Sequence, residues 1–151
     1  MEGTCGKITQ ETKNNNIIIR KTMKNNIRHK QEKIAEQYML QDYGNQISKQ
    51  FDILYVPAVF NYDYKSYTME IINNNCPIYS EELNKNIKYL EELKIFYDAY
   101  KKINYFPNDY ECFLQQETNK IAIIDFDKFQ KLHTNKNKFN IGPFIPTNFL
   151  F

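Results

Sequence analysis

The chain has 151 residues, which is enough for one domain with a hydrophobic core of its own. Its formal net charge is only +2, which excludes the broad basic surface that a nucleic-acid-binding protein needs. No apolar stretch approaches the length of a membrane-spanning helix, and the N-terminus lacks the apolar run of a signal peptide, so we expect a soluble, cytoplasmic protein without membrane contact.

The cysteines and histidines do not form a zinc-binding pattern. No Cys-x-x-Cys or Cys/His pair has the spacing of zinc ligands. Free thiols are typical of a reducing, intracellular compartment. These residues are Cys5, Cys76, Cys112, His29 and His133.

The N-terminal third of the chain predicts a hairpin followed by a helix. Within residues 1–24, the polar cluster Lys13-Asn14-Asn15-Asn16 precedes the β-branched run Ile17-Ile18-Ile19, a pattern typical of a turn and a strand. Residues 28–43 have apolar side chains at helical spacing, and we expect Gly44 to end this helix as a C-cap.

The middle of the chain predicts two strands and a long helix. The strands are expected at residues 53–60 and 65–72, with a turn at residues 61–64. Ser80 is the expected N-cap of the helix, which Pro107 would end.

The remaining elements complete an α+β fold. Short strands are expected at residues 112–114 and 121–124, and residues 134–151 have no clear period and would form an extended arm. The order of elements predicts an antiparallel sheet that carries one helix, followed by a mainly helical part. No repeat or linker divides the chain, so residues 1–151 are expected to form a single domain.

Two glycines near the N-terminus precede a strand with a basic end. The glycines lie in Gly3-Thr4-Cys5-Gly6-Lys7-Ile8, where the lack of a Cβ atom lets backbone approach phosphate groups. Strand alternation places Lys21 on the same face as Ile19, and Arg20 on the opposite face. We favour Lys21 over Arg20 as the functional residue of this strand; for the glycines the alternative is an ordinary turn, and for Lys21 it is a solvated lysine.

Acidic residues follow at three later positions. The expected first helix carries Glu32 and Glu36 one turn apart, and either could lie on a solvated face. Asp109 comes directly after Tyr105-Phe106-Pro107-Asn108, before the short hairpin. The apolar strand that ends this hairpin leads into Asp125-Phe126-Asp127, whose carboxylate oxygens suit a hard cation such as Mg²⁺.

In this order, the motifs resemble those of the protein-kinase-like superfamily. The resemblance covers roughly residues 1–130 and implies a kinase-like fold, with residues 1–72 as the small lobe and residues 73–133 as part of the C-terminal lobe. It also implies ATP and Mg²⁺ as cofactors. The residues expected to contact the nucleotide are Gly3, Gly6, Ile8, Ile19, Lys21, Met69, Glu70 and Ile71.

The resemblance implies a role for each charged residue. Lys21 would contact the α- and β-phosphates, and Glu36, with Glu32 as its competitor, would pair with Lys21 and hold it in place. Asp125 would hold Mg²⁺, with Asp127 adding a second carboxylate. Asp109 would position the acceptor hydroxyl.

The same resemblance implies the adenine site. Met69, within Tyr67-Thr68-Met69-Glu70-Ile71, would lie at the back of the adenine pocket. Backbone groups near Glu70 and Ile71 would form hydrogen bonds with adenine.

The chain departs from the family pattern in its catalytic loop and its length. Pro107 stands where the family has His or Tyr, and Leu114 stands where it has a metal-binding Asn. Glu111 could supply an oxygen in place of that Asn. The family's first loop glycine would fall at Met1, and no activation segment is recognisable after Asp127.

Three functions remain open from the sequence. The first is a minimal kinase that transfers phosphate from ATP to a hydroxyl on a protein. The second is a catalytically inactive, kinase-like binding module that acts through a protein partner, which the aromatic tail Phe139–Phe151 could contact. The third is an unrelated α+β interaction protein.

Overall fold

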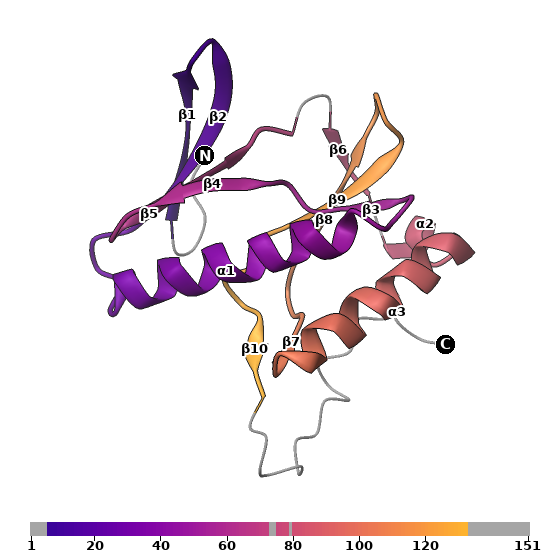
Figure 1. Cartoon of the computed structure of the whole chain (residues 1–151). Helices are drawn as coiled ribbons and strands as arrows, with labels where there is room; N and C mark the ends of the chain where they lie inside the picture. The colour runs from indigo at the N-terminus through magenta and orange to yellow at the C-terminus, as the bar shows by residue number, and fades with distance from the viewer. Residues whose placement is uncertain (1–5, 73–74, 79, 133–151) are drawn as a thin grey trace.

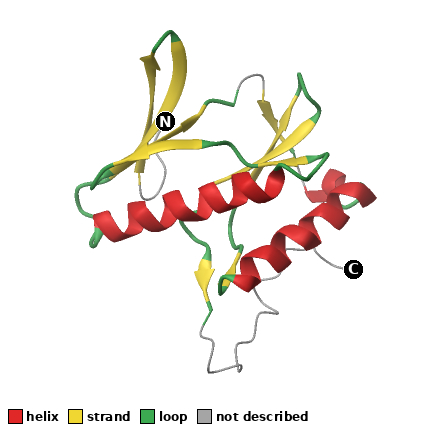
Figure 2. Cartoon of the chain, viewed as in Figure 1, coloured by secondary structure: helices red, strands yellow, loops and turns green. Residues whose placement is uncertain are grey.

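The computed structural model describes residues 6–72, 75–78 and 80–132. They form a mixed α+β structure with two four-stranded sheets and a long helix packed against the first sheet (Figure 1, Figure 2). In chain order the elements are β1 (Gly6–Lys13), β2 (Asn16–Met23), α1 (Lys30–Ser48), β3 (Leu54–Tyr55), β4 (Val59–Tyr62), β5 (Ser66–Glu70), β6 (Asn75–Pro77), α2 (Ser80–Leu83), α3 (Ile87–Lys102), β7 (Tyr105–Phe106), β8 (Glu111–Gln115), β9 (Lys120–Ile124) and β10 (Gln130–Lys131).

The N-terminal hairpin is confirmed. Strands β1 and β2 pair antiparallel, with Gly6 opposite Met23. The turn residues Asn14 and Asn15 have φ angles of 51° and 66°, the left-handed conformation that a two-residue hairpin turn requires and that asparagine tolerates. The sheet continues in the order β1-β2-β5-β4, and all neighbours in it are antiparallel.

The turn between β4 and β5 comes later than predicted. It was expected at residues 61–64, but β4 extends through Tyr62. The carboxylate of Asp63 accepts the N–H groups of Lys65 and Ser66 at 2.9 and 2.8 Å, which fixes the turn at this aspartate.

The second half of the described chain is not mainly helical, contrary to expectation. It contains strands β6 to β10 as well as α2 and α3. The predicted short hairpin is confirmed as β8 and β9, and the second sheet has the order β3-β9-β8-β6. Strand β3 pairs in parallel with β9, so this sheet joins the two halves of the chain.

Helix α1 is longer than predicted, and its glycine has a different role. Gly44 lies inside the helix rather than at its C-terminal cap. A Cβ atom at Gly44 would lie 2.5 Å from Tyr100 Oη and 3.2 Å from the methyl carbons of Val56. The glycine therefore permits close packing of α1 against α3 and the segment after β3.

The long helix expected after Ser80 is interrupted. Asn86 is extended, and its side chain accepts the N–H of Tyr89 at 3.0 Å, so α3 begins as a separate helix. The helix also ends before Pro107, because Asn104 takes a left-handed φ of 66°. The side chain of Ser80, the expected N-cap, lies outside the described residues.

A small core lies between the first sheet and α1. Met23, Tyr67 and Met69 pack there against Ile34 of the helix. We call this side of the sheet the inner face and the opposite side the outer face.

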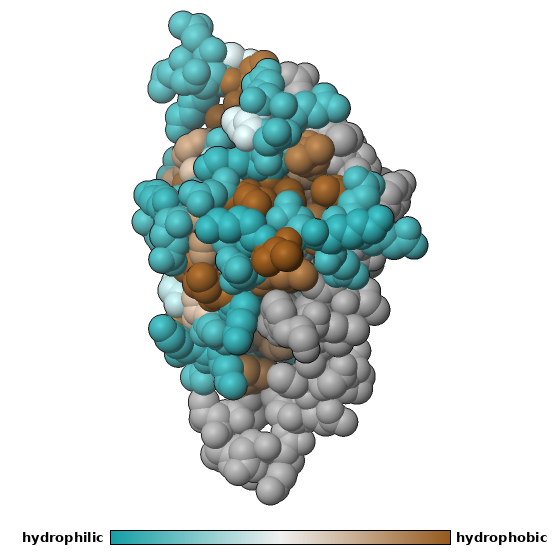
Figure 3. Space-filling model, turned by 90° about the vertical axis from the view of Figure 1, so that its right-hand side faces the viewer, coloured by the Kyte–Doolittle hydropathy of each residue, from teal (hydrophilic) through white to brown (hydrophobic). Residues whose placement is uncertain are grey.

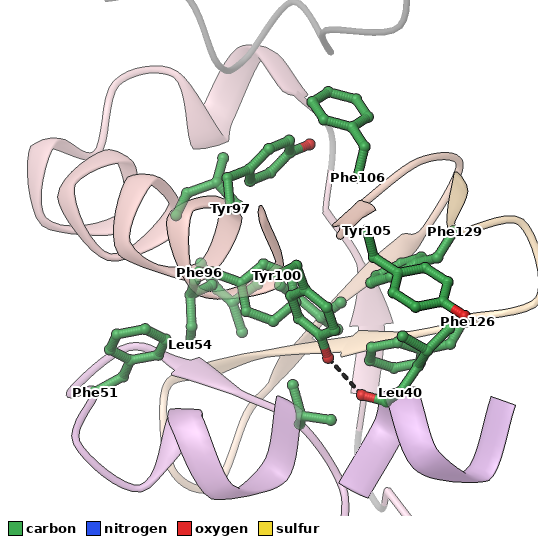
Figure 4. Close-up of a cluster of buried hydrophobic side chains, with 14 of the residues drawn as sticks. Leu40, Phe51, Leu54, Phe96, Tyr97, Tyr100, Tyr105, Phe106, Phe126 and Phe129 are labelled. Atoms are coloured by element: carbon green, nitrogen blue, oxygen red, sulfur yellow. Dashed lines mark hydrogen bonds between the residues drawn. The ribbon is translucent and has the colours of Figure 1, made fainter. Parts of the chain in front are cut away.

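A larger aromatic core joins α1, α3 and the segment after β9 (Figure 4). The rings of Phe96 and Tyr100 are 4.9 Å apart, and Phe129 lies 5.0 Å from Tyr100 and 4.7 Å from Phe126. The hydroxyl of Tyr100 donates to the carbonyl of Leu40 in α1. This core holds the segment that follows β9 against both helices.

The surface carries hydrophobic residues in separate patches. Figure 3 shows such patches lying between hydrophilic side chains. None of the described helices combines the length and apolar composition that a membrane crossing needs. The expected arm at residues 134–151 lies outside the described residues.

Candidate functional site

The candidate site lies on the inner face of the first sheet, where β2 meets the end of β9. Lys21 belongs to β2 and Asp125 directly follows β9, and Lys21 Nζ lies 3.4 Å from Asp125 Oδ1. Their side chains are 15% and 34% exposed, respectively. The two residues are 104 positions apart, so the tertiary fold brings them together.

Lys21 remains positively charged in this position. Burial lowers its pKa, but Tyr67, Asp125 and Asp127 act in the opposite direction, and the pKa is raised overall. Burial raises the pKa of Tyr67, the strand partner of Lys21, so this phenol is neutral near neutral pH. The two carboxyl groups are therefore the acidic partners that matter for Lys21.

Asp125 and Asp127 form a pair of neighbouring carboxyl groups. Partial burial and a hydrogen bond with Asp127 raise the pKa of Asp125 to about 6, against the opposing effect of Lys21. A divalent cation would replace the proton between the two groups and neutralise their charges.

This pair fits a Mg²⁺ ion that binds together with phosphate. Mg²⁺ takes one or two carboxylates from a protein and completes its shell with water and phosphate oxygens. In the described parts of the chain, no group of three or more His, Cys, Asp and Glu side chains is placed to hold a metal. Asp125 and Asp127 could therefore supply at most part of the ligand shell of such an ion.

The backbone and the next side chain fix Asp125 in place. Its φ angle of 78° is uncommon for a residue other than glycine. Phe126 is 1% exposed and packs into the aromatic core (Figure 4). Asp125 is thus held between strand β9 and a buried ring.

Arg20, the alternative to Lys21, lies on the outer face. Its guanidinium contacts Glu11, lies 2.8 Å from Ser66 Oγ, and lies 3.8 Å from Asp63. The structure therefore places Lys21 and not Arg20 beside Asp125, as strand alternation predicts.

Glu36 does not hold Lys21 in this structure. Its Oε2 accepts a hydrogen bond of 2.6 Å from the hydroxyl of Tyr105 in β7. Within the described residues, the ion pair of Lys21 is with Asp125, and Glu32 is exposed and forms no ion pair. The expected lysine–glutamate pair is absent because Tyr105 reaches Glu36 from the other half of the chain.

The glycine region has a structural role at Gly6. A Cβ atom there would lie 2.7 Å from the carbonyl oxygen of Thr22, so glycine permits close approach of β1 and β2. Ile8 stands directly opposite Lys21, and Ile19 opposite Met69. Gly3 lies outside the described residues.

The inner-face residues expected to contact the nucleotide lie together near Lys21. Met69 is buried, and its sulfur lies 3.6 Å from Gln41 Nε2 of α1. Because Ile8 and Ile19 alternate with outer-face residues and pair with Lys21 and Met69, both belong to the inner face.

At the end of β5, the backbone N–H and the carboxylate of Glu70 form hydrogen bonds within the chain. The N–H of Glu70 donates to the carbonyl of Ala58 at 2.8 Å. The carboxylate of Glu70 accepts the N–H of Ala58 at 3.0 Å and the hydroxyl of Tyr55. The Glu70 N–H is therefore not available for adenine, and Ile71 would have to supply a backbone donor.

Asp109 lies in the loop beside the Asp125 segment. Strand β7 pairs with β10, which brings the residues after Phe106 next to those before Gln130. Asp109 is exposed, has a φ of 52°, and lies 3.8 Å from Lys128 Nζ. Among the described residues, Asp109 forms no hydrogen bond or ion pair with Lys21 or Asp125.

Three contacts of the site have no signal in the sequence. Tyr67 beside Lys21, Tyr105 beside Glu36 and Lys128 beside Asp109 were all unforeseen. Strand pairing could have suggested Tyr67 only if the register of β2 and β5 had been known. The other two depend on the pairing of β7 with β10 and on the packing of α1.

The chain matches no protein-family model, and no curated protein matches it.

Proposed function

We propose that this chain is a minimal protein-kinase-like protein that binds ATP with Mg²⁺ and transfers the γ-phosphate to a hydroxyl on a protein. The observation that carries the proposal is the ion pair between Lys21 and Asp125. It joins a cation on the first sheet to a carboxylate pair in the second half of the chain, and triphosphate recognition needs both charges at one place.

The arrangement of elements supports the proposal further. An antiparallel sheet with one packed helix precedes a hairpin that ends in Asp125-Phe126-Asp127, in the order that the kinase-like family uses. The β7–β10 pair brings the Asp109 loop beside the residues that follow Asp127, where Asp109 lies 3.8 Å from Lys128 Nζ, and this neighbourhood supports Asp109 as the proposed acceptor-positioning residue.

In the proposed reaction, Lys21 would neutralise phosphate charge, and Asp125 and Asp127 would hold a Mg²⁺ ion, which would supply further neutralisation of phosphate charge. Asp109 orients the acceptor hydroxyl and accepts its proton. A bond forms between the hydroxyl oxygen and the γ-phosphorus while the bond from that phosphorus to the β,γ-bridging oxygen breaks, and ADP leaves. Positioning and charge neutralisation provide most of the rate enhancement in such transfers.

One observation favours a second function, a binding module without phosphotransfer. Glu36 is bound to Tyr105 and does not support Lys21. Pro107 and Leu114 also replace family residues of the catalytic loop. Such a module could bind nucleotide and act through a protein partner.

Transfer of labelled γ-phosphate separates the two functions. The full chain is incubated with labelled ATP, Mg²⁺ and a generic protein acceptor, and incorporation into the chain and the acceptor is measured. The kinase proposal predicts incorporation that disappears in Lys21→Ala and Asp125→Ala but persists in Lys13→Ala, an exposed lysine of the same sheet.

The outcomes decide between the candidates. Nucleotide binding without incorporation would favour the binding module. Incorporation that survives both Lys21→Ala and Asp125→Ala would contradict the assignment of the site.

A further inference from the structure

The two edges of the first sheet differ in how far they are protected from pairing with another strand. At the β4 edge, Tyr38 of α1 donates to the carbonyl of Phe60 at 3.3 Å and packs on Tyr62 with ring centroids 4.7 Å apart. The pairing of β4 with β5 is also irregular between Val59 and Tyr62. A covering helix and a bulge are common ways to block a sheet edge.

The β1 edge is unpaired among the described strands. Strand β1 has eight residues, and no described strand pairs with its free side (Figure 1). It contains no proline and no bulge in its pairing with β2. An edge of this length presents a row of backbone donors and acceptors that another strand can use.

The hydrogen-bond pattern identifies which groups are free. Met23 N–H donates to the carbonyl of Lys65, which lies on the β5 side of β2. Counting back along β2 from Met23, every second residue therefore directs its backbone N–H and C=O toward β5. The residues between them direct theirs toward β1. In the register of β1 and β2, the backbone N–H and C=O groups of Lys7, Thr9 and Glu11 then point toward β2. The backbone groups of Ile8, Gln10 and Thr12 consequently point outward.

We propose that β1 pairs antiparallel with β1 of a second copy of this chain, forming a two-fold symmetric dimer with one continuous sheet. In the favoured register, Ile8 exchanges both backbone hydrogen bonds with Gln10 of the second copy. This register uses only the outward-pointing groups and repeats itself under two-fold symmetry. The inference does not depend on the proposed function.

Charge complementarity selects this register. It places Lys7 opposite Glu11 of the second copy, twice per dimer by symmetry, and Thr9 opposite itself. If the two β1 strands were shifted by two residues in one direction, Lys7 would lie opposite Thr9 of the second copy. Shifted in the other direction, Lys7 would lie opposite Lys13 of the second copy. Opposite charges across a strand pair stabilise it, while like charges destabilise it.

The charges on the outer face favour an additional cation beside Glu11. Glu11 and Asp63 share the single guanidinium of Arg20, so the three ion-paired groups carry one excess negative charge. Among the described residues, Lys13 acts on Glu11 only through its charge and forms no ion pair with it. Lys7 is exposed and forms no ion pair within the described residues. Lys7 of the second copy would neutralise the excess charge.

The expected dimer is weak. A single strand pair is smaller than a standard interface, which buries about 800 Å² on each partner. We therefore expect dissociation in the micromolar range or above, and an affinity that falls as salt is added.

Sedimentation of the full chain over a concentration series up to millimolar tests the proposal. The unmodified chain should pass from monomer to dimer. Lys7→Glu should raise the dissociation constant about tenfold or more, since it sets like charges opposite each other at two places. Lys13→Gln removes a lysine charge on the same face outside the opposed pairs of the favoured register, creates no new opposite-charge pair, and should leave the constant nearly unchanged.

A mixing experiment tests the register itself. Glu11→Lys alone should also weaken the dimer, but an equimolar mixture of Lys7→Glu and Glu11→Lys chains should dimerise again, because every opposed pair regains opposite charges. Gln10→Pro removes an outward N–H and should abolish dimerisation, whereas Gln10→Ala should not. Circular dichroism checks that each variant is folded.

A chain that stays monomeric at millimolar concentration would overturn the proposal. So would a mixture that fails to dimerise, or Lys7→Glu and Gln10→Pro chains that are folded and dimerise as tightly as the unmodified chain.

Discussion

At the residue scale, the raised pKa of Asp125 makes the charge of the candidate site depend on pH near 6. Burial and the hydrogen bond with Asp127 raise the pKa of Asp125 to about 6 from an ordinary value of 3.8. The folded chain therefore binds this proton more tightly than the unfolded chain. The resulting stabilisation is fully present below the unfolded pKa and is lost as the pH rises through the folded pKa.

Two pH effects follow for Asp125. Mg²⁺ affinity, measured by calorimetry with a nucleotide present, should fall as the pH drops through about 6, because protons compete with the cation. Without metal, Asp125→Asn should raise Tm near neutral pH and remove this residue's part of the pH dependence. Asp127→Asn, the control, should shift the titration of Asp125 to lower pH. A Mg²⁺ affinity that is constant through this range would contradict the assignment.

Gly44 provides a second residue-scale prediction. An added Cβ atom would lie 2.5 Å from Tyr100 Oη, so Gly44→Ala should lower the free energy of unfolding by about 1–3 kcal/mol, although the same change in an exposed helix is usually stabilising. Denaturant unfolding measures the effect. Gln46→Ala, at an exposed position of the same helix, should have little effect. A Gly44→Ala chain of unchanged stability would show that α1 and α3 pack less closely.

At the element scale, Glu92 connects α3 to the segment between α1 and β3. It is only 4% exposed, and its carboxylate accepts the N–H groups of Asp52, Ile53 and Leu54 at 2.7, 2.9 and 2.9 Å. Three otherwise unsatisfied backbone donors are thereby paired in a buried place. This connection fixes the start of β3 and hence its parallel pairing with β9.

Glu92→Gln tests this connection. The amide of glutamine would present its own N–H₂ group to at least one of the backbone donors, so we expect a loss of about 1–3 kcal/mol in the free energy of unfolding. Glu91→Gln changes an exposed neighbour and serves as the matched control. Equal stability of the two variants in urea unfolding would show that the carboxylate is not needed.

The elements also show which features a sequence can predict. Local patterns were enough for the β1–β2 hairpin, for the β8–β9 hairpin and for the face of Lys21, because alternation and turn residues act over short distances. They were not enough for Gly44, whose role depends on Tyr100, or for Glu36, whose partner Tyr105 is distant in sequence. The interruption of the long helix depends on the side chain of Asn86, a local signal that the prediction of one helix from Ser80 to Pro107 did not use.

At the scale of the whole molecule, the candidate site lies where the two halves of the chain meet. Lys21 comes from the first sheet, while Asp125 is held by the aromatic core of the second half through Phe126. Their pairing therefore requires both cores to be folded. A ligand that binds both charges would stabilise the entire fold, by mass action on the folded state.

Thermal unfolding with and without ATP and Mg²⁺ tests this account most directly. We expect millimolar ATP with Mg²⁺ to raise Tm of the unmodified chain and of Lys13→Ala. The increase should be lost in both Lys21→Ala and Asp125→Ala, compared with each variant's own Tm without ligand. No increase for the unmodified chain, or an increase that persists in both site variants, would contradict nucleotide binding at the Lys21–Asp125 site.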